Sequence, residues 1–430
     1  MGHLAHKDAY RELGTALDGL TVRVPWTETL RAILEELYTE EEARLVSRMP
    51  TGLASLGRVC RVTGMEEGRL LPLLERLAGK GLVMDLEVAG EYRYTISPMV
   101  IGIFELTMMR TDGEPDFKRL AALFHEYMMS RESLSAANFS HGERVSFLRT
   151  LPHQGALASE PHVEVLDHQK AEALVDAAPG VTIGICSCRH EKMHLGTKQC
   201  AAPLESCIGF AGESDYSVRR GMARPADKNE VHELLARARD LKMVFNADNV
   251  RTGVSFLCLC CGCCCNVLTG IKRFGLPNVV VTSGFLAACS EPLCTGCGKC
   301  SKDCPIGAIG MESTEAPGAR KRLRPRVDTS FCIGCGVCGL SCTTGAMRLV
   351  PKAQRALLPE NTIERVILQS LERGTLQNFI VDNPNTGSSR FLRAVLAAFL
   401  GLAPIKRAIM SDTFRSRFLS RITAGLTGPG

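Results

Sequence analysis

Eight cysteines in the last third of the chain stand in two copies of one spacing. Residues 294–309 read CTGCGKCSKDCPIGAI and residues 332–347 read CIGCGVCGLSCTTGAM, so the second copy begins 38 residues after the first. Each copy is a C-x2-C-x2-C-x3-C run, the ligand spacing of cubane iron–sulfur clusters. Glycines recur at matching positions and let the backbone turn its N–H groups towards sulfur. The pattern predicts two [4Fe–4S] clusters, with zinc binding by both repeats as the alternative.

A second group of cysteines lies upstream of these runs. Residues 186–189 read CSCR, and Cys200 and Cys207 follow them. Residues 258–265 read CLCCGCCC, with six cysteines in eight positions, which is improbable as ordinary packing. Sulfur ligands suit an iron–sulfur cluster or a zinc ion. The candidate ligands of a third metal site are Cys186, Cys188, Cys200, Cys207, Cys258, Cys260, Cys261, Cys263, Cys264 and Cys265.

Only a subset of this group is expected to bind one metal, because a tetrahedral ion has four coordination positions. Neighbouring thiolates such as those of Cys264 and Cys265 usually point apart, so the remaining cysteines would be core, supporting or redox residues. Two short apolar runs, 181–185 and 243–246, predict buried strands before the cysteines. Thiolates at the carboxyl ends of two strands, facing the loop that carries Cys200, would close a four-coordinate sulfur site.

The identity of this third centre stays open between an iron–sulfur cluster and zinc. His190 and His194 could each replace a thiolate, which would favour zinc. A thiol redox centre and an inert core are the remaining alternatives. Cys60 is interpreted as a small buried apolar residue, and Cys289, just before the first run, is left unassigned.

The whole cysteine array resembles the multidomain iron–sulfur proteins known as dicluster ferredoxin-domain proteins, over roughly residues 181–350. The resemblance implies electron transfer. In two-cluster ferredoxins the fourth cysteine of each run serves the other cluster. Pro305 follows Cys304 as that pattern expects, whereas Thr343 replaces the second proline. Carried over by position, one cluster takes Cys294, Cys297, Cys300 and Cys342, and the other takes Cys332, Cys335, Cys338 and Cys304.

Length and composition are those of an ordinary globular protein apart from the twenty cysteines. The 430 residues suffice for two to four domains, with 45% hydrophobic residues, 23% charged residues and a net charge of +5. Residues 1–10 have no apolar signal-peptide core, so we expect a reducing cytoplasmic compartment, where clustered thiols bind metal instead of pairing. The longest apolar stretch, 394–405, is too short to span a membrane.

The N-terminal part has the pattern of a winged helix-turn-helix domain. The predicted elements are helices over 29–47, 53–59 and 65–80 and strands over 82–86 and 92–96. DNA binding is one use of such a domain. Glu66 and Glu67 open the would-be recognition helix, however, and acids facing a polyanion are unfavourable. A docking or structural role is therefore the preferred interpretation, and DNA is the alternative partner.

The chain as a whole is predicted to be an α+β multidomain protein. Its segments are an N-terminal segment (1–28), the winged-helix-like domain (29–97), a helical connector (98–180), a cysteine-rich α/β metal-binding domain (181–290), a ferredoxin-like 2[4Fe–4S] domain (291–350) and a helical basic C-terminal region (351–430). His153, His162 and His168 in the connector are interpreted as surface or packing residues, with metal binding as the alternative.

Two basic segments bear on partners. Residues 320–326, between the cysteine runs, read RKRLRPR, which predicts either a solvated hairpin or a docking patch for an acidic redox protein. A helix is expected over 357–371 and a linker over 382–389. Residues 390–422 alternate apolar side chains with Lys and Arg. They are expected to pack on the protein or on a second copy in a homodimer, and peripheral contact with the cytoplasmic face of a membrane is the alternative.

The leading functional hypothesis is an electron-transfer protein or redox-complex subunit that carries low-potential electrons. The alternatives are an iron–sulfur redox-sensing transcriptional regulator and a reductase with a substrate site at the middle cysteines. Neither a G-x-G-x-x-G nor a G-x4-G-K-[ST] motif occurs, so nucleotide chemistry is not supported. No catalytic residue can be assigned from the sequence.

Overall fold

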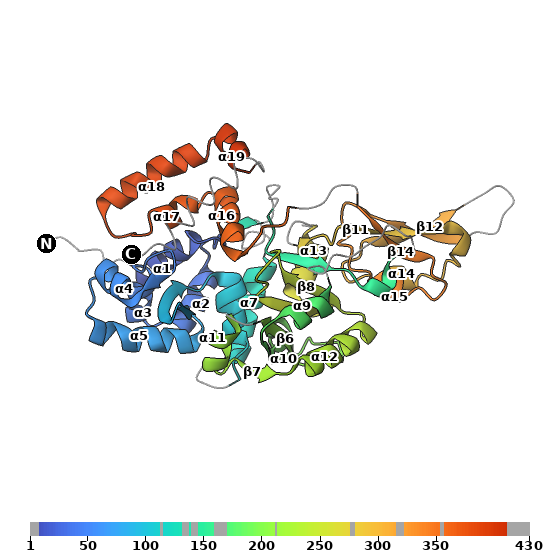
Figure 1. The fold of residues 1–430 in the computed structure, drawn as a ribbon, viewed down its shortest axis with the longest axis horizontal. Coiled ribbons are helices and arrows are strands. Elements are labelled where there is room, and N and C mark those ends of the chain that lie inside the picture. Colours follow the sequence, from blue (N-terminus) through green and yellow to red (C-terminus); the bar gives the residue numbers. More distant parts are fainter. Residues whose placement is uncertain are drawn as a thin grey trace. The chain divides into compact units, whose positions relative to one another are not determined.

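Helices and strands alternate along the chain in the computed structural model, as expected for a mixed α+β protein (Figure 1). The structure describes residues 8–111, 115–130, 137–138, 145–158, 170–210, 213–275, 280–314, 322–352 and 357–410. These residues fall into two compact units. The first unit comprises 1–141, 215–222 and 363–430, and the second comprises 142–214 and 223–362.

The first unit opens with three helices; the first lies in the predicted N-terminal segment, and the other two stand where the sequence predicted a single helix over 29–47. They are α1 (Ala9–Asp18), α2 (Glu28–Leu37) and α3 (Glu40–Val46). The chain breaks between the last two because Thr39 starts a new helix, with its side chain and that of Glu42 forming a capping box. The predicted apolar stripe is nevertheless buried, since Leu30, Ile33 and Leu34 are fully enclosed.

Two further helices and a hairpin follow in the predicted order. They are α4 (Leu56–Thr63), α5 (Glu67–Lys80), β2 (Val83–Val88) and β3 (Glu91–Ile96), with the short β1 (Ala54–Ser55) pairing to β3. The first of these helices starts at Leu56 and not at the predicted residue 53, because Ser55 caps it. Gly64 and Gly81 end the two helices with φ of 72° and 81°, the left-handed conformation that glycine adopts without strain.

The segment 98–180, predicted as a helical connector, is only partly helical. It contains an irregular turn at Met99–Ile103, α6 (Phe104–Met108), α7 (Phe117–Met129), a 3-10 turn at Gln154–Ala156 and α9 (Ala171–Ala177). It also contains the strand β4 (Leu148–Leu151), so the helical prediction is wrong there. His153 is buried and its Nε2 lies 2.7 Å from the carbonyl oxygen of Met243. His162 and His168 lie outside the described residues.

A seven-stranded sheet in the order β10-β4-β8-β9-β6-β5-β7 forms the centre of the second unit. Besides β4, its strands are β5 (Val181–Ile185), β6 (Glu205–Phe210), β7 (Ala223–Ala226), β8 (Val244–Asp248), β9 (Phe256–Cys260) and β10 (Val280–Val281). The strand predictions over 181–185 and 243–246 are thus confirmed, the second with its bounds moved. Strands β5 and β9 both run antiparallel to β6, so their carboxyl ends lie at the same edge.

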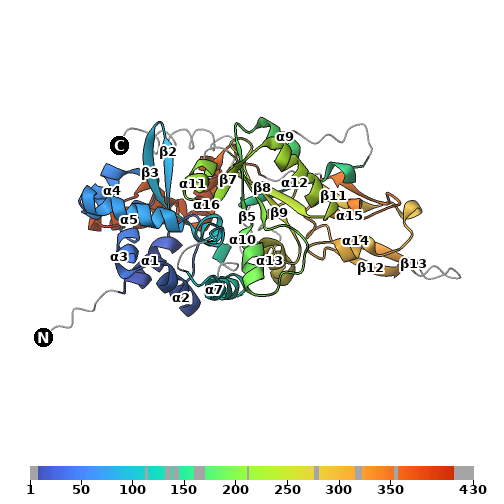
Figure 2. The ribbon, with the colours of Figure 1, turned by 90° about the horizontal axis from the view of Figure 1, so that it is seen from below.

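Helices cover both faces of this sheet (Figure 2). One face is apolar: Ile183, Ile208 and Leu257 form a core with α9 and with α12 (Lys228–Asp240). Side chains alternate along a strand, so the cysteines of β6 and β9 point to the opposite face. That face carries α10 (Ser187–His194) and α13 (Asn266–Phe274).

The two cysteine runs lie in a small module framed by two strand pairs. Strand β11 (Phe285–Cys289) pairs antiparallel with β14 (Met347–Pro351), and β12 (Ile309–Thr314) pairs antiparallel with β13 (Arg322–Val327). The short helices α14 (Lys299–Asp303) and α15 (Val337–Leu340) and a 3-10 turn at Glu291–Leu293 complete the module. The basic insert therefore forms a hairpin arm, although Arg320 and Lys321 lie outside the described residues.

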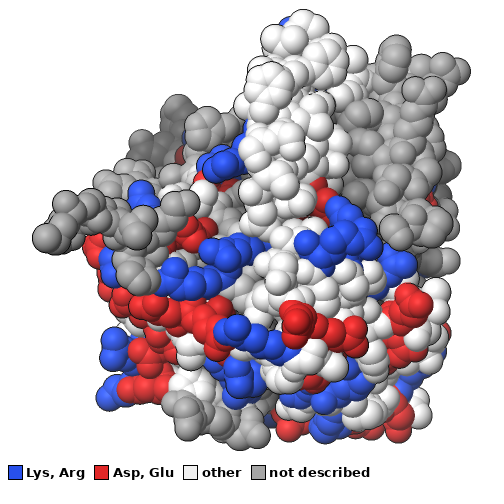
Figure 3. All heavy atoms as spheres, turned by 90° about the vertical axis from the view of Figure 1, so that its left-hand side faces the viewer, with Lys and Arg blue, Asp and Glu red and all other residues white. Residues whose placement is uncertain are grey.

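Four helices form the described C-terminal part. They are α16 (Thr362–Arg373), α17 (Leu376–Ile380), α18 (Gly387–Leu400) and α19 (Ala403–Ile409). The predicted helix over 357–371 therefore begins later, and the linker over 382–389 ends where Thr386 caps α18. Phe391 in α18 is 73% exposed, and uncharged side chains gather at the top of Figure 3, where α18 lies. Among the described helices, none has the length and apolarity that crossing a membrane requires.

Candidate iron–sulfur and metal centres

Four cysteines line a common cavity, three from the first run and one from the second. Its walls include Cys294, Cys297, Cys300 and Cys342, together with Gly296 and Gly298. The three cysteines of the first run follow one loop, and Cys342 reaches the cavity from beyond α15. These are the four residues that the family resemblance assigns to one cluster.

The second run gathers around the remaining cysteine of the first. Burial is the main cause that raises the pKa of Cys338 to about 12, and the thiols of Cys332 and Cys304 raise it further. Burial also raises the pKa of Cys332 and Cys335, and Cys304 contributes to both shifts. Cys304 of the first run therefore lies close to the thiols of the second run.

Backbone geometry explains why glycines recur in both runs. Gly334 and Gly336 have φ of 67° and 85°. A Cβ on Gly334 would lie 2.2 Å from the carbonyl oxygen of Phe285, and one on Gly336 would lie 2.9 Å from the Cβ of Ala156. Both the conformation and the space exclude a side chain there. The loop can therefore wrap closely around a cluster while it packs against its neighbours.

Backbone N–H groups point at the cysteine sulfurs. The amide of Ala308 donates to Sγ of Cys304 at 3.2 Å, and that of Met347 donates to Sγ of Cys342 at 3.3 Å. Gly296 donates in the same way to Cys294 at 3.4 Å. Donors of this kind stabilise a thiolate and make a cluster bound to it easier to reduce. The donor set therefore suits anionic sulfur ligands.

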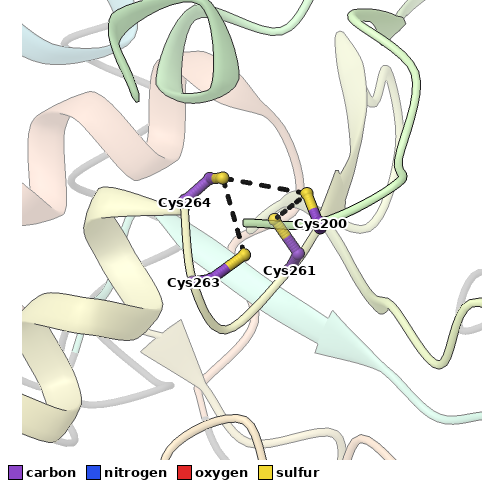
Figure 4. A group of neighbouring side chains, drawn as sticks. All are labelled: Cys200, Cys261, Cys263 and Cys264. Atoms are coloured by element: carbon purple, nitrogen blue, oxygen red, sulfur yellow. Dashed lines mark hydrogen bonds between the residues drawn. The ribbon is translucent and has the colours of Figure 1, made fainter. Parts of the chain in front are cut away.

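Four of the ten middle cysteines form a tight group on loops at the edge of the sheet (Figure 4). The sulfurs of Cys200, Cys261, Cys263 and Cys264 all lie within 4.8 Å of one another. We call them the four-thiol group. The sulfur of Cys200 lies 3.6 Å from that of Cys261 and 3.8 Å from that of Cys264, and the sulfurs of Cys263 and Cys264 are 3.6 Å apart.

These separations match one metal ion better than a cubane. Four sulfurs bound tetrahedrally to one zinc ion at about 2.3 Å lie about 3.8 Å apart. In a cubane each cysteine binds a different iron from outside the cube, which sets the sulfurs farther apart. His190 and His194 are not part of the group. Their Nε2 atoms lie 3.0 Å from each other. Replacement of a thiolate by histidine is thus not what the described residues show.

A buried arginine supplies positive charge to this group. Arg189 is 1% exposed, and its guanidinium donates to the carbonyl oxygens of Pro203, at 3.1 Å, and Leu259 and to the hydroxyl of Ser206. No carboxylate forms an ion pair with it in the described part of the chain. The thiol of Cys264 and then Arg189 lower the pKa of Cys261 to about 4, against the effect of burial. A thiolate at Cys261 is therefore favoured.

The loop that carries three cysteines of the four-thiol group approaches the ferredoxin-type module at Gly262. Gly262 separates two of its cysteines, and a Cβ there would lie 3.0 Å from the carbonyl oxygen of Pro305 and 3.1 Å from its Cα. Pro305 directly follows Cys304. Nearby, Nζ of Lys242 lies 2.5 Å from a carboxylate oxygen of Asp303. The loops of the two sulfur sites are thus packed against each other.

The other middle cysteines lie along the sheet and the starts of α10 and α13 and do not belong to this group. They are Cys186, Cys188, Cys207, Cys258, Cys260 and Cys265. Cys60 is half-buried in α4, and Cys289 lies next to the thiol of Cys294. Sequence reasoning missed Arg189, although the CSCR motif contained it.

Comparison with known proteins bears on the module alone. Residues 293–346 match the family model of the 4Fe-4S dicluster domain. No curated protein and no solved structure matched the chain. The chain therefore carries an iron–sulfur domain of the ferredoxin type, which binds [4Fe–4S] clusters and has a general role in electron transfer.

Proposed function

We propose that the chain is an electron-transfer protein or a redox-complex subunit that uses two [4Fe–4S] clusters and one further metal ion. One cluster would be bound by Cys294, Cys297, Cys300 and Cys342, and the other by Cys332, Cys335, Cys338 and Cys304. The crossing of the fourth cysteines carries the proposal: Cys342 lines the cavity of the first run, and Cys304 lies among the thiols of the second. This exchange is the arrangement of two-cluster ferredoxins.

Each cluster supplies one-electron chemistry when it is bound, and the chain's own residues tune it. The amides of Ala308 and Met347 stabilise the thiolates that carry the negative charge. Arg324 lies beside the first cluster site and donates to the carbonyl oxygens of Cys294, at 2.8 Å, and Glu291, at 2.7 Å. Positive charge and N–H donors near a cluster both favour its reduced form.

The further metal ion is proposed for the four-thiol group, as a tetrahedral thiolate-bound zinc or iron ion. The spacing of the sulfurs supports a single ion, and Arg189 offsets part of the negative charge of four thiolates. Gly262 lies close to Pro305, so an ion bound by the four-thiol group would lie next to the loop of the proposed second cluster. An iron ion there would extend the path of electron transfer, and a zinc ion would stabilise the loop.

The N-terminal helices and hairpin are proposed as a winged-helix-like docking module. Three cations of this module that could contact DNA phosphates are paired with acids: Arg58 with Asp382, Arg69 with Glu41, and Lys80 with Glu42. Such pairing lowers the positive potential that DNA binding requires. The charge distribution therefore favours a protein partner for this module over the alternative of a DNA-binding regulator.

EPR of the reduced protein, prepared without oxygen, tests the crossed ligand sets. Cys304→Ala should perturb the same cluster as Cys335→Ala, and Cys342→Ala should perturb the same cluster as Cys300→Ala. Cys60→Ala, in α4, serves as the control for the loss of a thiol. A Cys304→Ala spectrum that matches that of Cys300→Ala would refute the ligand sets, and absence of any cluster signal would refute the function.

Metal analysis of Cys263→Ser tests the further ion. We expect the variant to lose about one metal ion per chain, because three thiolates bind a tetrahedral ion much more weakly than four. The ferredoxin EPR signals should remain. Unchanged metal content in this variant would remove the ion from the proposal and leave the two clusters in place.

A further inference from the structure

Six buried or half-buried thiols outside the four-thiol group converge on the other face of the sheet. Cys207 and Cys258 lie directly opposite each other on β6 and β9, and Cys258 lies opposite Asn246 on β8. Residues in direct register share a face, and Cys260, two positions further along β9, shares it too. Cys186, Cys188 and Cys265 join them from the starts of α10 and α13. We call these six cysteines the six-thiol group.

The thiols of this group follow one another as neighbours. The thiols of Cys207 and Cys260 raise the pKa of Cys258, together with burial. Cys265 in turn interacts with both Cys260 and Cys188. The group is therefore a continuous array across two strands and two helix starts.

A buried ion-pair network holds the helical members in place. The ammonium of Lys192 on α10 donates to the carboxylate of Glu191 at 2.6 Å and to the side-chain oxygen of Asn266 on α13 at 2.9 Å. The side-chain amide of Asn266 in turn donates to the carboxylate of Glu191. All three side chains are less than a tenth exposed. The network ties the two helix starts together and so fixes Cys188 beside Cys265.

Two buried donors at the array face cysteine sulfur. Asn246 is fully buried; its Oδ1 accepts from Thr150 at 2.9 Å, while its Nδ2 makes no hydrogen bond to nitrogen or oxygen. Its register places it on the thiol face, where its side chain interacts with Cys260 and lowers the pKa of that thiol. The buried Arg189 interacts in the same way with the thiol of Cys261. Both side chains are therefore placed to stabilise anionic sulfur.

We propose that the six-thiol group binds a polynuclear iron–sulfur cluster, separate from the ion of the four-thiol group. Six thiolates exceed the four positions of one tetrahedral ion. Asn246 and Arg189 would donate to the thiolates and sulfides of such a cluster. Arg189 interacts with Cys261 of the four-thiol group and with Cys186 and Cys260 of the six-thiol group, so its charge serves both sites.

Iron and acid-labile sulfide counts on the unmodified chain, purified without oxygen, test this directly. The ferredoxin-type module accounts for about eight irons and eight sulfides. We expect a clear excess of both above that number. A count of about eight sulfides overturns the proposal, and so does zinc in place of the extra iron. This measurement needs no variant, so a folding defect cannot obscure it.

The double variant Cys188→Ser/Cys265→Ser tests whether the excess iron and sulfide are bound by the six-thiol group. It should bring iron and sulfide down to about eight per chain, with the ferredoxin EPR signals unchanged as evidence that the chain still folds. Cys200→Ser/Cys263→Ser is the matched control and should keep the excess sulfide. If the control loses the sulfide and Cys188→Ser/Cys265→Ser keeps it, the cluster is not in the six-thiol group. The proposed ferredoxin function would survive either result, since neither variant alters the module.

Arg189 is a positioning residue in this proposal. The midpoint potential of the extra cluster tests its role. Arg189→Gln should shift the midpoint potential of the extra cluster to more negative values, because a cation that favours the reduced form is lost. Arg189→Lys should restore most of the shift. A purely structural arginine would instead lower stability in both variants and leave the potential of any remaining cluster unchanged.

Discussion

The ferredoxin-type module and the cysteine-rich sheet both gather thiols, but they place them by different means. In the module the ligand positions are set by spacing within short loops, and left-handed glycines such as Gly298 and Gly336 start the helices that follow. In the sheet, strand register and helix starts bring together cysteines up to 79 residues apart, from Cys186 to Cys265. In the module three of the four cysteines at each site come from one short loop, whereas in the sheet the grouping depends on the whole tertiary fold.

The two regions also differ in how they balance charge. Around the module, backbone amides and the half-exposed Arg324 face the thiolates, and Cys297 is exposed. In the sheet, the sulfur sites are held by side chains inside the protein, namely Arg189, Asn246 and the Glu191–Lys192 pair. Substitutions should therefore act locally in the module and globally in the sheet. Four predictions test this contrast.

The largest effect is expected from a ligand of the module. Cys335→Ala should abolish one of the two clusters and lower the iron content by about four per chain. Because the loops are local, far-UV circular dichroism of the sheet-containing chain should change little. Iron analysis and EPR measure the loss. Collapse of the whole chain on this substitution would contradict a local arrangement.

Loss of a buried charge in the sheet comes next. Glu191→Ala leaves Lys192 buried without its anion, which should lower the free energy of unfolding by about 3–5 kcal/mol. Glu205→Ala, which breaks the exposed pair with Arg224, is the control and should cost less than about 1 kcal/mol. Denaturant unfolding of the metal-loaded protein measures both. Equal effects would show that the buried network does not brace the sheet.

The contact between the two regions gives a smaller effect. Gly262→Ala brings a methyl group into contact with the backbone of Pro305, which should cost about 1–2 kcal/mol and alter the EPR signal of the cluster that Cys304 binds. Gly270→Ala in α13 is the control, because a Cβ there meets no atom within 4 Å. Helix propensity should make the control neutral or slightly stabilising. An unaltered EPR signal in Gly262→Ala would separate the two regions functionally.

The smallest effect concerns surface charge at the module. Arg324→Gln removes a cation that lowers the pKa of Cys294, where burial acts in the opposite direction. The midpoint potential of the first cluster should become more negative by less than about 59 mV, a tenfold change in equilibrium for one electron. Arg326→Gln, whose exposed side chain pairs with Glu312, should shift it less. Equal shifts in the two variants would show that the overall positive charge of the hairpin, and not the position of Arg324, sets the midpoint potential.

The contrast also explains what could be predicted from the sequence. Local patterns were sufficient for the strand over 181–185, for the end of the helix over 65–80, and for the cysteine spacing that the family model also recognises. Patterns decided by tertiary context did not. The segment 29–47 has apolar residues at helical spacing throughout, but the structure divides it into two helices at the Thr39 cap. The strand β4 is isolated in sequence from the sheet that it joins.

The partition of the middle cysteines could not be predicted for the same reason. Six thiols in eight residues point in different directions, since β9 ends within them and the next turn reverses the chain. Which thiols meet then depends on Cys200 and Cys207, whose positions follow from β6 and its preceding loop. Arg189 and Asn246 gave no signal, because a lone arginine and asparagine become informative only when their burial is known.

The pairing of β11 with β14 has a consequence for how such a protein can arise. These two strands flank the ferredoxin-type module, and Cys289 near its start is in register with Met347 near its end. The module therefore enters and leaves the rest of the chain at adjacent points. A segment with neighbouring ends can be inserted into a host fold, or transferred to another, without displacing the elements on either side. In evolutionary terms, the adjacent ends favour transfer of the module as one segment, whereas the cysteines of the sheet come from several separate strands and helices.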